Sequence, residues 1–372
     1  MFRLPLHSAA KFSVDLITHY LPDRSQKTYH SDKYFSFIHL GYKQKMKISD
    51  ELASAIASVT EVAAVAAFDW VGKQDKNAAD KAAVEAMRNR LNEIDFHGKI
   101  VIGEGEIDDA PMLYIGEQVG KQSGSVGLDI AVDPIDGTRM VACNEKNAIA
   151  VLAAAPTGTL LQAPDMYMEK LVVGAAAKGA VHLANPLEKN LEFLSSALNK
   201  PISSLSIAVL DKPRHQHIIK TIRNFGANVI TIPDGDVLAS LLTILPEHPI
   251  DMMYGTGGAP EGIISAAIAR ALGGDMQARL VSRDKAKGDS EENKQLAAQE
   301  VLRCQQMGLE IGEVLSLDQM VSTSDVIFAA TAITPTILMD GVSIDAYSRI
   351  SNTILVNGRD RSLKLINNRY FN

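Results

Sequence analysis

Two stretches between residues 50 and 94 are predicted to form helices: the first is rich in alanine, and the second has apolar residues on one face, at Ala83, Met87, Leu91 and Ile94. The first runs from about residue 50 to residue 71, where Ser49 or Asp50 is a plausible cap and Gly72 the stop. The second runs from about residue 78 to residue 94. A polar, turn-like link joins them, so the pattern predicts a pair of packed helices.

Short apolar runs predict strands over residues 99–102, 130–132 and 148–155, with a helix over residues 110–119. From about residue 205 strands and helices alternate. This part of the pattern predicts strands at 206–210, 228–232 and 250–254, and helices at 213–225, at 236–245 and after the glycine-rich run 255–262. Such alternation favours parallel βαβ units, whose strand-end loops bind ligands. Residues 326–372 contain two or three further strand-like runs.

The composition is that of a globular protein, with 46% hydrophobic and 22% charged residues among 372. This length accommodates two domains, and a composition shift near residues 185–204 marks the boundary between them. We therefore predict domains over residues 46–195 and 196–372, and leave open whether the last strands return to the first. The fold class is α/β in the broad sense, with an α+β first domain and an α/β second domain.

Charge and cysteine content narrow the functional classes. The net charge of −7 gives no indication of a nucleic-acid partner. Two cysteines are too few for a disulfide framework or a zinc site, so we expect a cytoplasmic protein. No apolar window reaches the ~18 residues that a membrane-spanning helix needs, so we expect no membrane association.

Residues 1–45 differ from the rest of the chain. They hold eight of the 20 aromatic residues and carry a net charge of +4, against −11 for the remainder. No apolar core of signal-peptide length occurs among them. We interpret them as a disordered extension, or as an over-long gene prediction, since Met46 immediately precedes a helix start. A chain that begins at Met46 is expected to fold and to remain active.

The most informative stretch surrounds Asp133 and Asp136. A buried strand ends at Asp133, and Pro134 forces a turn because it lacks a backbone donor. Gly137 and Thr138 follow at a possible helix start, where free amides can bind an anion. Carboxylates beside such amides suggest a metal-dependent phosphatase. The alternative, an ordinary Asp-Pro turn with Asp136 as a helix cap, has similar weight.

A second acidic stretch, residues 104–109, holds four carboxylates between and after two glycines. These carboxylates would repel one another unless cations or solvent intervene. The stretch is either a cation site or a solvated loop. Residues Arg279, Arg283, Lys285 and Lys287 are interpreted as a solvated face.

Taken with Asp80 and Glu104, the Asp133 turn resembles the lithium-sensitive, metal-dependent phosphomonoesterases. More closely, the chain resembles class II fructose-1,6-bisphosphatases from about Met46 to its end. The stretches that carry this resemblance are residues 75–80, 102–108, 163–170, 212–215, 232–236 and 257–262. Two features depart from the family pattern: the extension before Met46, and Asp136 at a position where class II enzymes usually carry Glu.

The resemblance implies a layered α/β/α/β/α sandwich and a divalent Mn²⁺ or Mg²⁺. It implies metal ligands at Asp80, Glu104, Asp133, Asp136 and Glu261, with the Ile135 carbonyl as a further candidate. It places a sugar bisphosphate on Asp136, Gly137, Thr138, Tyr167, Lys212, Pro213, Arg214, Asp234, Gly235, Asp236 and Gly258. A homo-oligomer, dimer or tetramer, is also expected.

General chemistry supplies roles for these side chains. Thr138 is suited to orient a metal-activated water, and Glu104 or Asp108 to assist its deprotonation. Lys212 and Arg214 suit the phosphate that is not cleaved. Tyr167 either binds this phosphate or packs. Asp234 and Asp236 either bind sugar hydroxyls or cap helices.

Three functions remain open at this point. The first is hydrolysis of fructose 1,6-bisphosphate to fructose 6-phosphate, a step of gluconeogenesis. The second is the same chemistry on sedoheptulose 1,7-bisphosphate or on inositol monophosphate. The third is a non-catalytic protein that binds sugar phosphates. Two cationic residues, Lys212 and Arg214, favour a bisphosphate.

Overall fold

The computed structural model describes residues 47–103, 113–124 and 126–371. Residues 45–372 form one compact unit. Among the described residues, the first sheet contains eight strands: β1 (His97–Ile102), β2 (Gln118–Val119), β3 (Gly127–Asp136), β4 (Ile149–Pro156), β11 (Ile327–Ala332), β12 (Ser343–Ile344), β13 (Ser348–Asn357) and β14 (Ser362–Phe371). Their order is β12-β13-β11-β4-β3-β1-β2, with β14 on β13.

The second sheet contains six described strands: β5 (Tyr167–Val173), β6 (Ser206–Leu210), β7 (Asn228–Ile232), β8 (Met252–Gly258), β9 (Asp275–Val281) and β10 (Leu315–Ser316). Their order is β10-β9-β5-β8-β6-β7. β6 runs parallel to both β7 and β8, as the strand–helix alternation predicts. β5 pairs antiparallel with β8 and β9, so the sheet is mixed.

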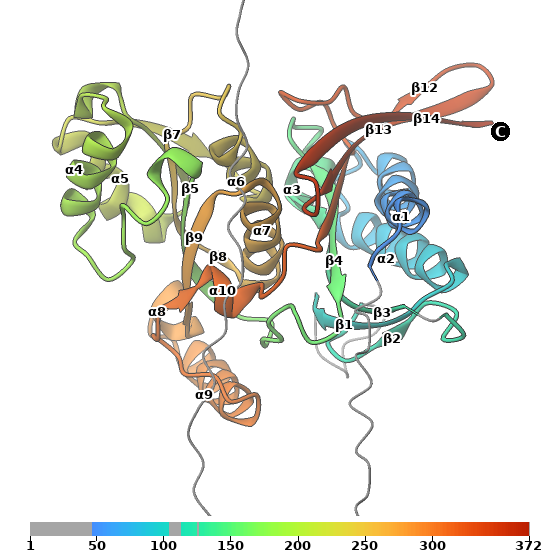
Figure 1. The fold of residues 1–372 in the computed structure, drawn as a ribbon, viewed down its shortest axis with the longest axis horizontal. Helices are drawn as coiled ribbons and strands as arrows, with labels where there is room; N and C mark the ends of the chain where they lie inside the picture. Colours follow the sequence, from blue (N-terminus) through green and yellow to red (C-terminus); the bar gives the residue numbers. More distant parts are fainter. Residues whose placement is uncertain (1–46, 104–112, 125, 372) are drawn as a thin grey trace, which may run out of the picture. The chain divides into compact units, whose positions relative to one another are not determined.

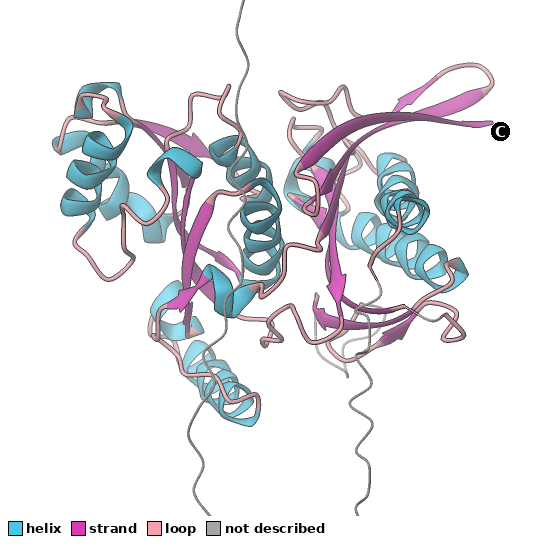
Figure 2. Cartoon of the chain, in the orientation of Figure 1, coloured by secondary structure: helices cyan, strands magenta, loops and turns pink. Residues whose placement is uncertain are grey.

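Helices lie on both outer faces and between the sheets (Figures 1 and 2). They are α1 (Asp50–Phe68), α2 (Lys76–Glu93), α3 (Thr138–Cys143), α4 (Leu187–Leu198), α5 (Gln216–Asn224), α6 (Val237–Ile244), α7 (Ala259–Leu272), α8 (Arg283–Lys287), α9 (Glu291–Gln306) and α10 (Leu317–Met320). α1 and α2 cover one face of the first sheet, α6 and α7 separate the two sheets, and α4 and α5 cover the second sheet. The order of layers is therefore α/β/α/β/α, and the α/β fold class is confirmed.

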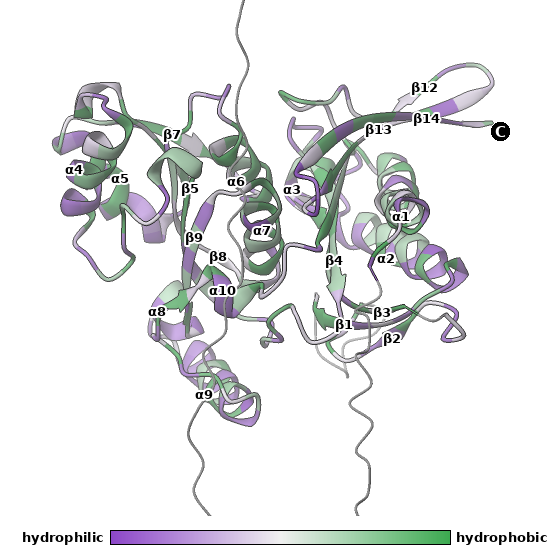
Figure 3. Cartoon of the chain, viewed as in Figure 1, coloured by the Kyte–Doolittle hydropathy of each residue, from purple (hydrophilic) through white to green (hydrophobic). Residues whose placement is uncertain are grey.

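Successive side chains along the strands pack into different hydrophobic cores. On β1 and β3, Ile100 and Ile130 pack toward α1 and α2, whereas Val101 and Ala131 pack in the core around α7. A strand buried on both faces reads as a continuous apolar run rather than an alternating one. Figure 3 shows the corresponding hydropathy, with hydrophobic α7 inside and hydrophilic residues along α9.

The two helices predicted near residue 50 are present. Ser49 caps α1 and accepts a hydrogen bond from the Leu52 N–H at 3.1 Å. Asp75 caps α2, three residues before the predicted start. By length and composition α1 is the one described helix that could span a membrane, but half of its apolar window is buried, as in a core helix.

The predicted helix over residues 110–119 is wrong for its described part. Residues 113–117 form a turn that leads into β2. Leu113, Ile115 and Val119 are buried here because the segment lies along the edge of β1, where backbone pairing replaces helical hydrogen bonds. Residues 110–112 lie outside the described residues.

The proposed division at residue 195 stays a prediction. β5 belongs to the second sheet, whereas β11, β13 and β14 lie in the first. The expectations for residues 1–45 lie outside the described residues.

Candidate active site

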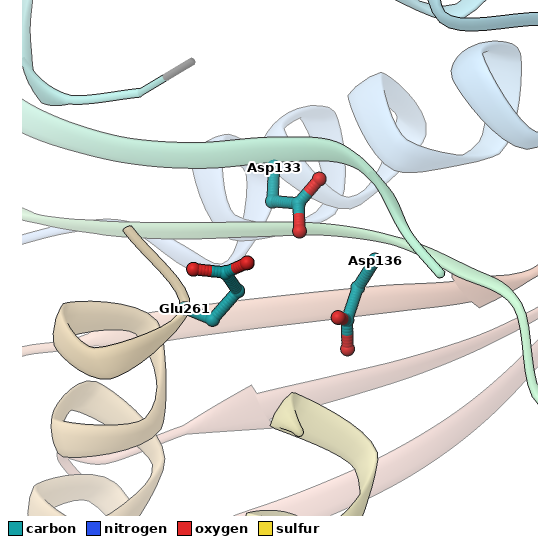
Figure 4. Close-up of side chains that lie close together, drawn as sticks. All are labelled: Asp133, Asp136 and Glu261. Atoms are coloured by element: carbon teal, nitrogen blue, oxygen red, sulfur yellow. The ribbon is translucent and has the colours of Figure 1, made fainter. Parts of the chain in front are cut away.

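Three carboxylates meet where β3 ends and α7 begins. Asp133 and Asp136 come from β3, and Glu261 from the first turn of α7. One oxygen of each lies within 4.8 Å of the others, and Figure 4 shows the three side chains facing one another. We call this group the acidic cluster. Such a set of oxygen ligands is suited to a hard divalent cation.

The backbone around Pro134 differs from the sharp turn expected at Asp133. β3 continues to Asp136, and its register with β4 shifts between Asp133 and Asp136. The Ile135 N–H donates to Asp133 Oδ1 at 3.0 Å, which stabilises this irregularity. Gly137, at φ +98°, is the cap residue of α3, so Asp136 does not serve as a cap. The irregular register lets both aspartates reach the cluster.

Burial and mutual repulsion act on the acidic cluster. Burial, with the Asp236 and Glu261 carboxylates, raises the pKa of Asp136 well above its ordinary value. The Lys170 ammonium and the Val237 N–H, 3.2 Å from Asp136, act in the opposite direction. Burial also raises the pKa of Glu261 to about 7. A bound cation would compensate these charges, so the residues fit a divalent metal.

Asp80 and Thr138 lie next to each other. Burial raises the pKa of Asp80 to about 6, although a hydrogen bond from Thr138 lowers it. The Thr138 hydroxyl also lies 3.3 Å from the Ile135 carbonyl oxygen. Asp80 Oδ1 and Glu261 Oε2 are buried without a hydrogen-bond partner among the described residues. Asp80 is not one of the three clustered carboxylates, and Glu104 and Asp108 lie outside the described residues.

A cavity of about 400 Å³ opens on the acidic cluster. Most of the residues predicted for the site line it: Asp133, Asp136, Gly137, Thr138, Tyr167, Lys212, Arg214, Asp234, Gly235, Asp236, Gly258 and Glu261. Pro213 and Asp80 do not line it. A Cβ atom at Gly258 would lie 2.1 Å from Glu261 Oε2, so a larger residue here would displace the Glu261 carboxylate.

Cationic side chains line another part of the cavity. Lys212 Nζ lies 3.0 Å from Asp234 Oδ1. Arg214 donates from Nε and Nη2 to the Thr256 carbonyl oxygen, at 2.9 and 2.7 Å, and its guanidinium lies 5.3 Å from the centre of the Tyr167 ring. Cations and carboxylates thus share one cavity, an arrangement suited to a metal and an anionic substrate.

Lys170 and His215 were not predicted as site residues, but they hold parts of the chain next to this cavity in place. Lys170 on β5 is fully buried, and its Nζ contacts both oxygens of Asp236 at 2.9 and 2.7 Å. Asp236 stands at the cap position of α6, yet its side chain makes no cap hydrogen bond. His215 accepts the Thr256 N–H at Nε2 and contacts the Leu210 carbonyl through Nδ1. Nothing in the local sequence marks the contacts of Lys170 with Asp236 and of His215 with Thr256, because these partners are 66 and 41 residues apart.

Arg283 and Lys287, interpreted from the sequence as part of a solvated face, both line the cavity together with Asp165, although Lys287 is also exposed to solvent. They lie on α8, which directly follows β9. A signal for them existed in the sequence, since strand-end loops of such sheets bind ligands. The charged composition of residues 275–300 concealed it.

Comparison with known proteins gives a family match. Residues 50–370 match the family model "Bacterial fructose-1,6-bisphosphatase, glpX-encoded". Fructose-1,6-bisphosphatase 1 class 2 of Escherichia coli (strain K12) is 52% identical over 316 residues, 85% of this chain and 94% of that protein. The class 2 enzyme of Haemophilus influenzae is 53% identical over 315 residues, with the same coverage of both chains.

A relative with a broader name is 41% identical over 334 residues, 86% of this chain and 100% of that protein. It is the D-fructose 1,6-bisphosphatase class 2/sedoheptulose 1,7-bisphosphatase of Prochlorococcus marinus (strain MIT 9312). The solved structure of an extragenic suppressor from Pyrococcus furiosus covers 52% of this chain and 69% of its own, at 15% identity and a TM-score of 0.26. That similarity is too low to bear on the fold.

Proposed function

Because the chain belongs to the family of bacterial, glpX-encoded fructose-1,6-bisphosphatases, we propose that it hydrolyses fructose 1,6-bisphosphate to fructose 6-phosphate and phosphate. The observation that carries this assignment is the cavity in which an acidic cluster and a cationic wall meet. A phosphatase for a bisphosphate needs both, since one phosphate reacts beside a cation while the other is held by basic side chains.

A divalent ion, Mg²⁺ or Mn²⁺, would be held by Asp133, Asp136 and Glu261, with Asp80 and Glu104 as further ligands. When bound, this ion would lower the pKa of a water and neutralise phosphate charge. Asp80 and Glu261 each have a buried oxygen without a hydrogen-bond partner among the described residues, which supports this assignment because buried polar atoms are rarely left unpaired.

The side chains of the protein then position the substrate. Thr138 lies between Asp80 and the Ile135 carbonyl, where its hydroxyl can orient the attacking water and pass a proton to Asp80. Glu104 and Asp108 are the further candidates for the base. The amides that follow Gly137 are available to the phosphoryl oxygens.

Remaining contacts fix the sugar and the second phosphate. Lys212, Arg214 and Tyr167 are assigned to the phosphate that is not cleaved. Asp234 and Asp236 are assigned to sugar hydroxyls, with Gly235 and Gly258 as close backbone neighbours. Asp236 keeps acceptor capacity, because each carboxylate oxygen can accept more than one hydrogen bond.

Sedoheptulose 1,7-bisphosphate is the second candidate substrate. It is supported by the name of the Prochlorococcus marinus relative, although that relative is less similar than those named for fructose 1,6-bisphosphate alone. Lithium inhibition, a cytoplasmic location and a homo-oligomer complete the proposal. Lithium inhibition rests on the family resemblance of the motifs, and the cytoplasmic location on the low cysteine content.

The test is phosphate release from fructose 1,6-bisphosphate, sedoheptulose 1,7-bisphosphate and inositol monophosphate, with Mg²⁺ or Mn²⁺ and with added Li⁺. We expect the first substrate to react fastest and Asp133→Asn to abolish turnover. Asp251→Asn is the matched control, a buried aspartate paired with Lys200 outside the cavity. It is expected to lower stability and keep turnover. Normal release by Asp133→Asn would refute the metal assignment.

A further inference from the structure

Two cations of the cavity wall have no role in the assignment above. Four basic side chains line the cavity, and two of them, Arg283 and Lys287, come from α8. The other two, Lys212 and Arg214, already use hydrogen-bonding capacity within the protein, Lys212 on Asp234 and Arg214 on the Thr256 carbonyl.

Arg283 has donor capacity that the protein does not use. Its Nε is buried and has no hydrogen-bond partner among the described residues. The neighbouring Glu300 carboxylate accepts the backbone N–H of Arg283 at 2.7 Å and also interacts electrostatically with the Arg283 guanidinium. A buried donor without a partner is costly, and a ligand that accepts a hydrogen bond removes this cost.

Strand register places α8 beside Tyr167. Tyr167 pairs with Val281 of β9, and α8 begins two residues later. As a result Lys287 Nζ lies 5.8 Å from the centre of the Tyr167 ring, close to the 5.3 Å of Arg214. Two cations from different elements therefore converge on one aromatic side chain, and Arg283 adds a third positive charge to the same cavity.

Like charges gathered in one cavity repel one another unless an anion binds between them. A phosphate group suits this place because it carries up to two negative charges and three acceptor oxygens, which guanidinium and ammonium donors match. A neutral sugar hydroxyl would add no negative charge to that of Asp165, which lines the same cavity. The ligand chemistry that these residues recognise is therefore a phosphate monoester.

We propose that Arg283 and Lys287, with Arg214 and Tyr167, clamp the phosphate that is not cleaved and so set the preference for bisphosphates over monophosphates. This inference rests on the proposed function. It assigns specificity to α8, an element that takes no part in the acidic cluster.

The experiment compares Arg283→Met and Lys287→Met with Lys285→Met, which removes an exposed lysine of the same helix that does not line the cavity. The steady-state parameters kcat and KM are measured for fructose 1,6-bisphosphate and for fructose 1-phosphate, which lacks the second phosphate. Each cavity variant should lower kcat/KM for the bisphosphate about 10- to 100-fold, mainly through KM, because a charged hydrogen bond is lost. Fructose 1-phosphate should react almost as before.

Binding of fructose 6-phosphate, measured by calorimetry, gives a readout that needs no turnover. Its affinity should fall by a similar factor in both cavity variants and stay unchanged in Lys285→Met. Equal losses on both substrates, or unchanged affinity for fructose 6-phosphate, would overturn the clamp. If Arg283→Met does not fold, Lys287→Met still tests the clamp, because Lys287 is exposed and its replacement should leave the fold intact. Absence of phosphate release by the wild-type chain would instead refute the proposed function.

Discussion

Thr138 illustrates how one hydroxyl can serve chemistry rather than structure. It occupies the first position of α3, whose cap residue is Gly137 and lacks a side-chain cap bond. Thr138 is therefore not the cap of this helix. Its hydroxyl instead lies near the Ile135 carbonyl oxygen and bonds to Asp80. A side chain in this position can orient a water beside the acidic cluster.

Replacing Thr138 separates these roles. Thr138→Ala should lower kcat about 100-fold with a smaller change in KM, because orienting the attacking water matters mainly in the transition state. Thr138→Ser keeps the hydroxyl and should retain part of the rate. The measurements are kcat, KM and melting temperature for both variants. If Thr138→Ala melts lower but turns over normally, the water is activated elsewhere, with Glu104 or Asp108 the next candidates.

At the scale of elements, the Lys170–Asp236 ion pair connects β5 to the start of α6. Both side chains are almost inaccessible to solvent, at 0% and 2%. The ammonium also lowers the pKa values of Asp136 and Glu261, against the effect of burial. Lys170 is thus a positive charge beside the acidic cluster. Through Asp236 it also holds the loop that carries Asp234 and Gly235.

Breaking this pair should be costly. Lys170→Met leaves the Asp236 carboxylate buried without a counter-ion, and we expect a loss of about 3–5 kcal/mol in the free energy of unfolding. Lys200→Met is the control, since Lys200 is 45% exposed beside its partner Asp251 and should cost less. Urea unfolding measures both. The double variant Lys170→Met/Asp236→Asn should regain part of the free energy of unfolding that Lys170→Met loses. A double variant less stable than Lys170→Met would argue against a stabilising ion pair.

At the scale of the whole molecule, the cavity joins elements of different layers. The acidic cluster combines the first sheet with the middle helices, whereas Tyr167, Lys212 and Arg214 come from strands or strand ends of the second sheet. Repulsion within the cluster therefore acts between layers. A cation at this place would stabilise their packing as well as the reaction.

Stability without metal should consequently depend on pH. Burial raises the pKa of Glu261 from 4.5 to about 7 and that of Asp80 from 3.8 to about 6, so the folded state holds these protons more tightly than the unfolded state. The contribution of these two groups to stability is then fully present below pH about 4 and is lost as the pH rises toward 7. Melting of chelator-treated protein should show this decline, and Glu261→Gln should reduce it. Saturating Mn²⁺ should restore stability near pH 7. A decline equally steep in Glu261→Gln would contradict this assignment.

Local sequence patterns were sufficient for much of the fold. The strands predicted at residues 206–210 and 228–232 coincide with β6 and β7, and the helix pair near residue 50 is present. These elements depend on apolar periodicity and on caps such as Ser49, which act over a few residues. The predicted helix over residues 110–119 fails in its described part because pairing with β1, a contact distant in sequence, overrides local preference.

The sequence by itself determined which side chains can do chemistry. Motifs around Asp133, Asp136, Arg214 and Glu261 identify the family, because metal and phosphate chemistry demands particular residue types and a shared fold keeps them in the same order along the chain. Only the tertiary structure decided which of these side chains contact one another. It unites Lys170 with Asp236 and brings α8 into the cavity wall, contacts that depend on strand register and layer packing between residues far apart in the chain. No single local pattern specifies contacts between segments so far apart in the chain, so the fold was needed to identify which side chains meet.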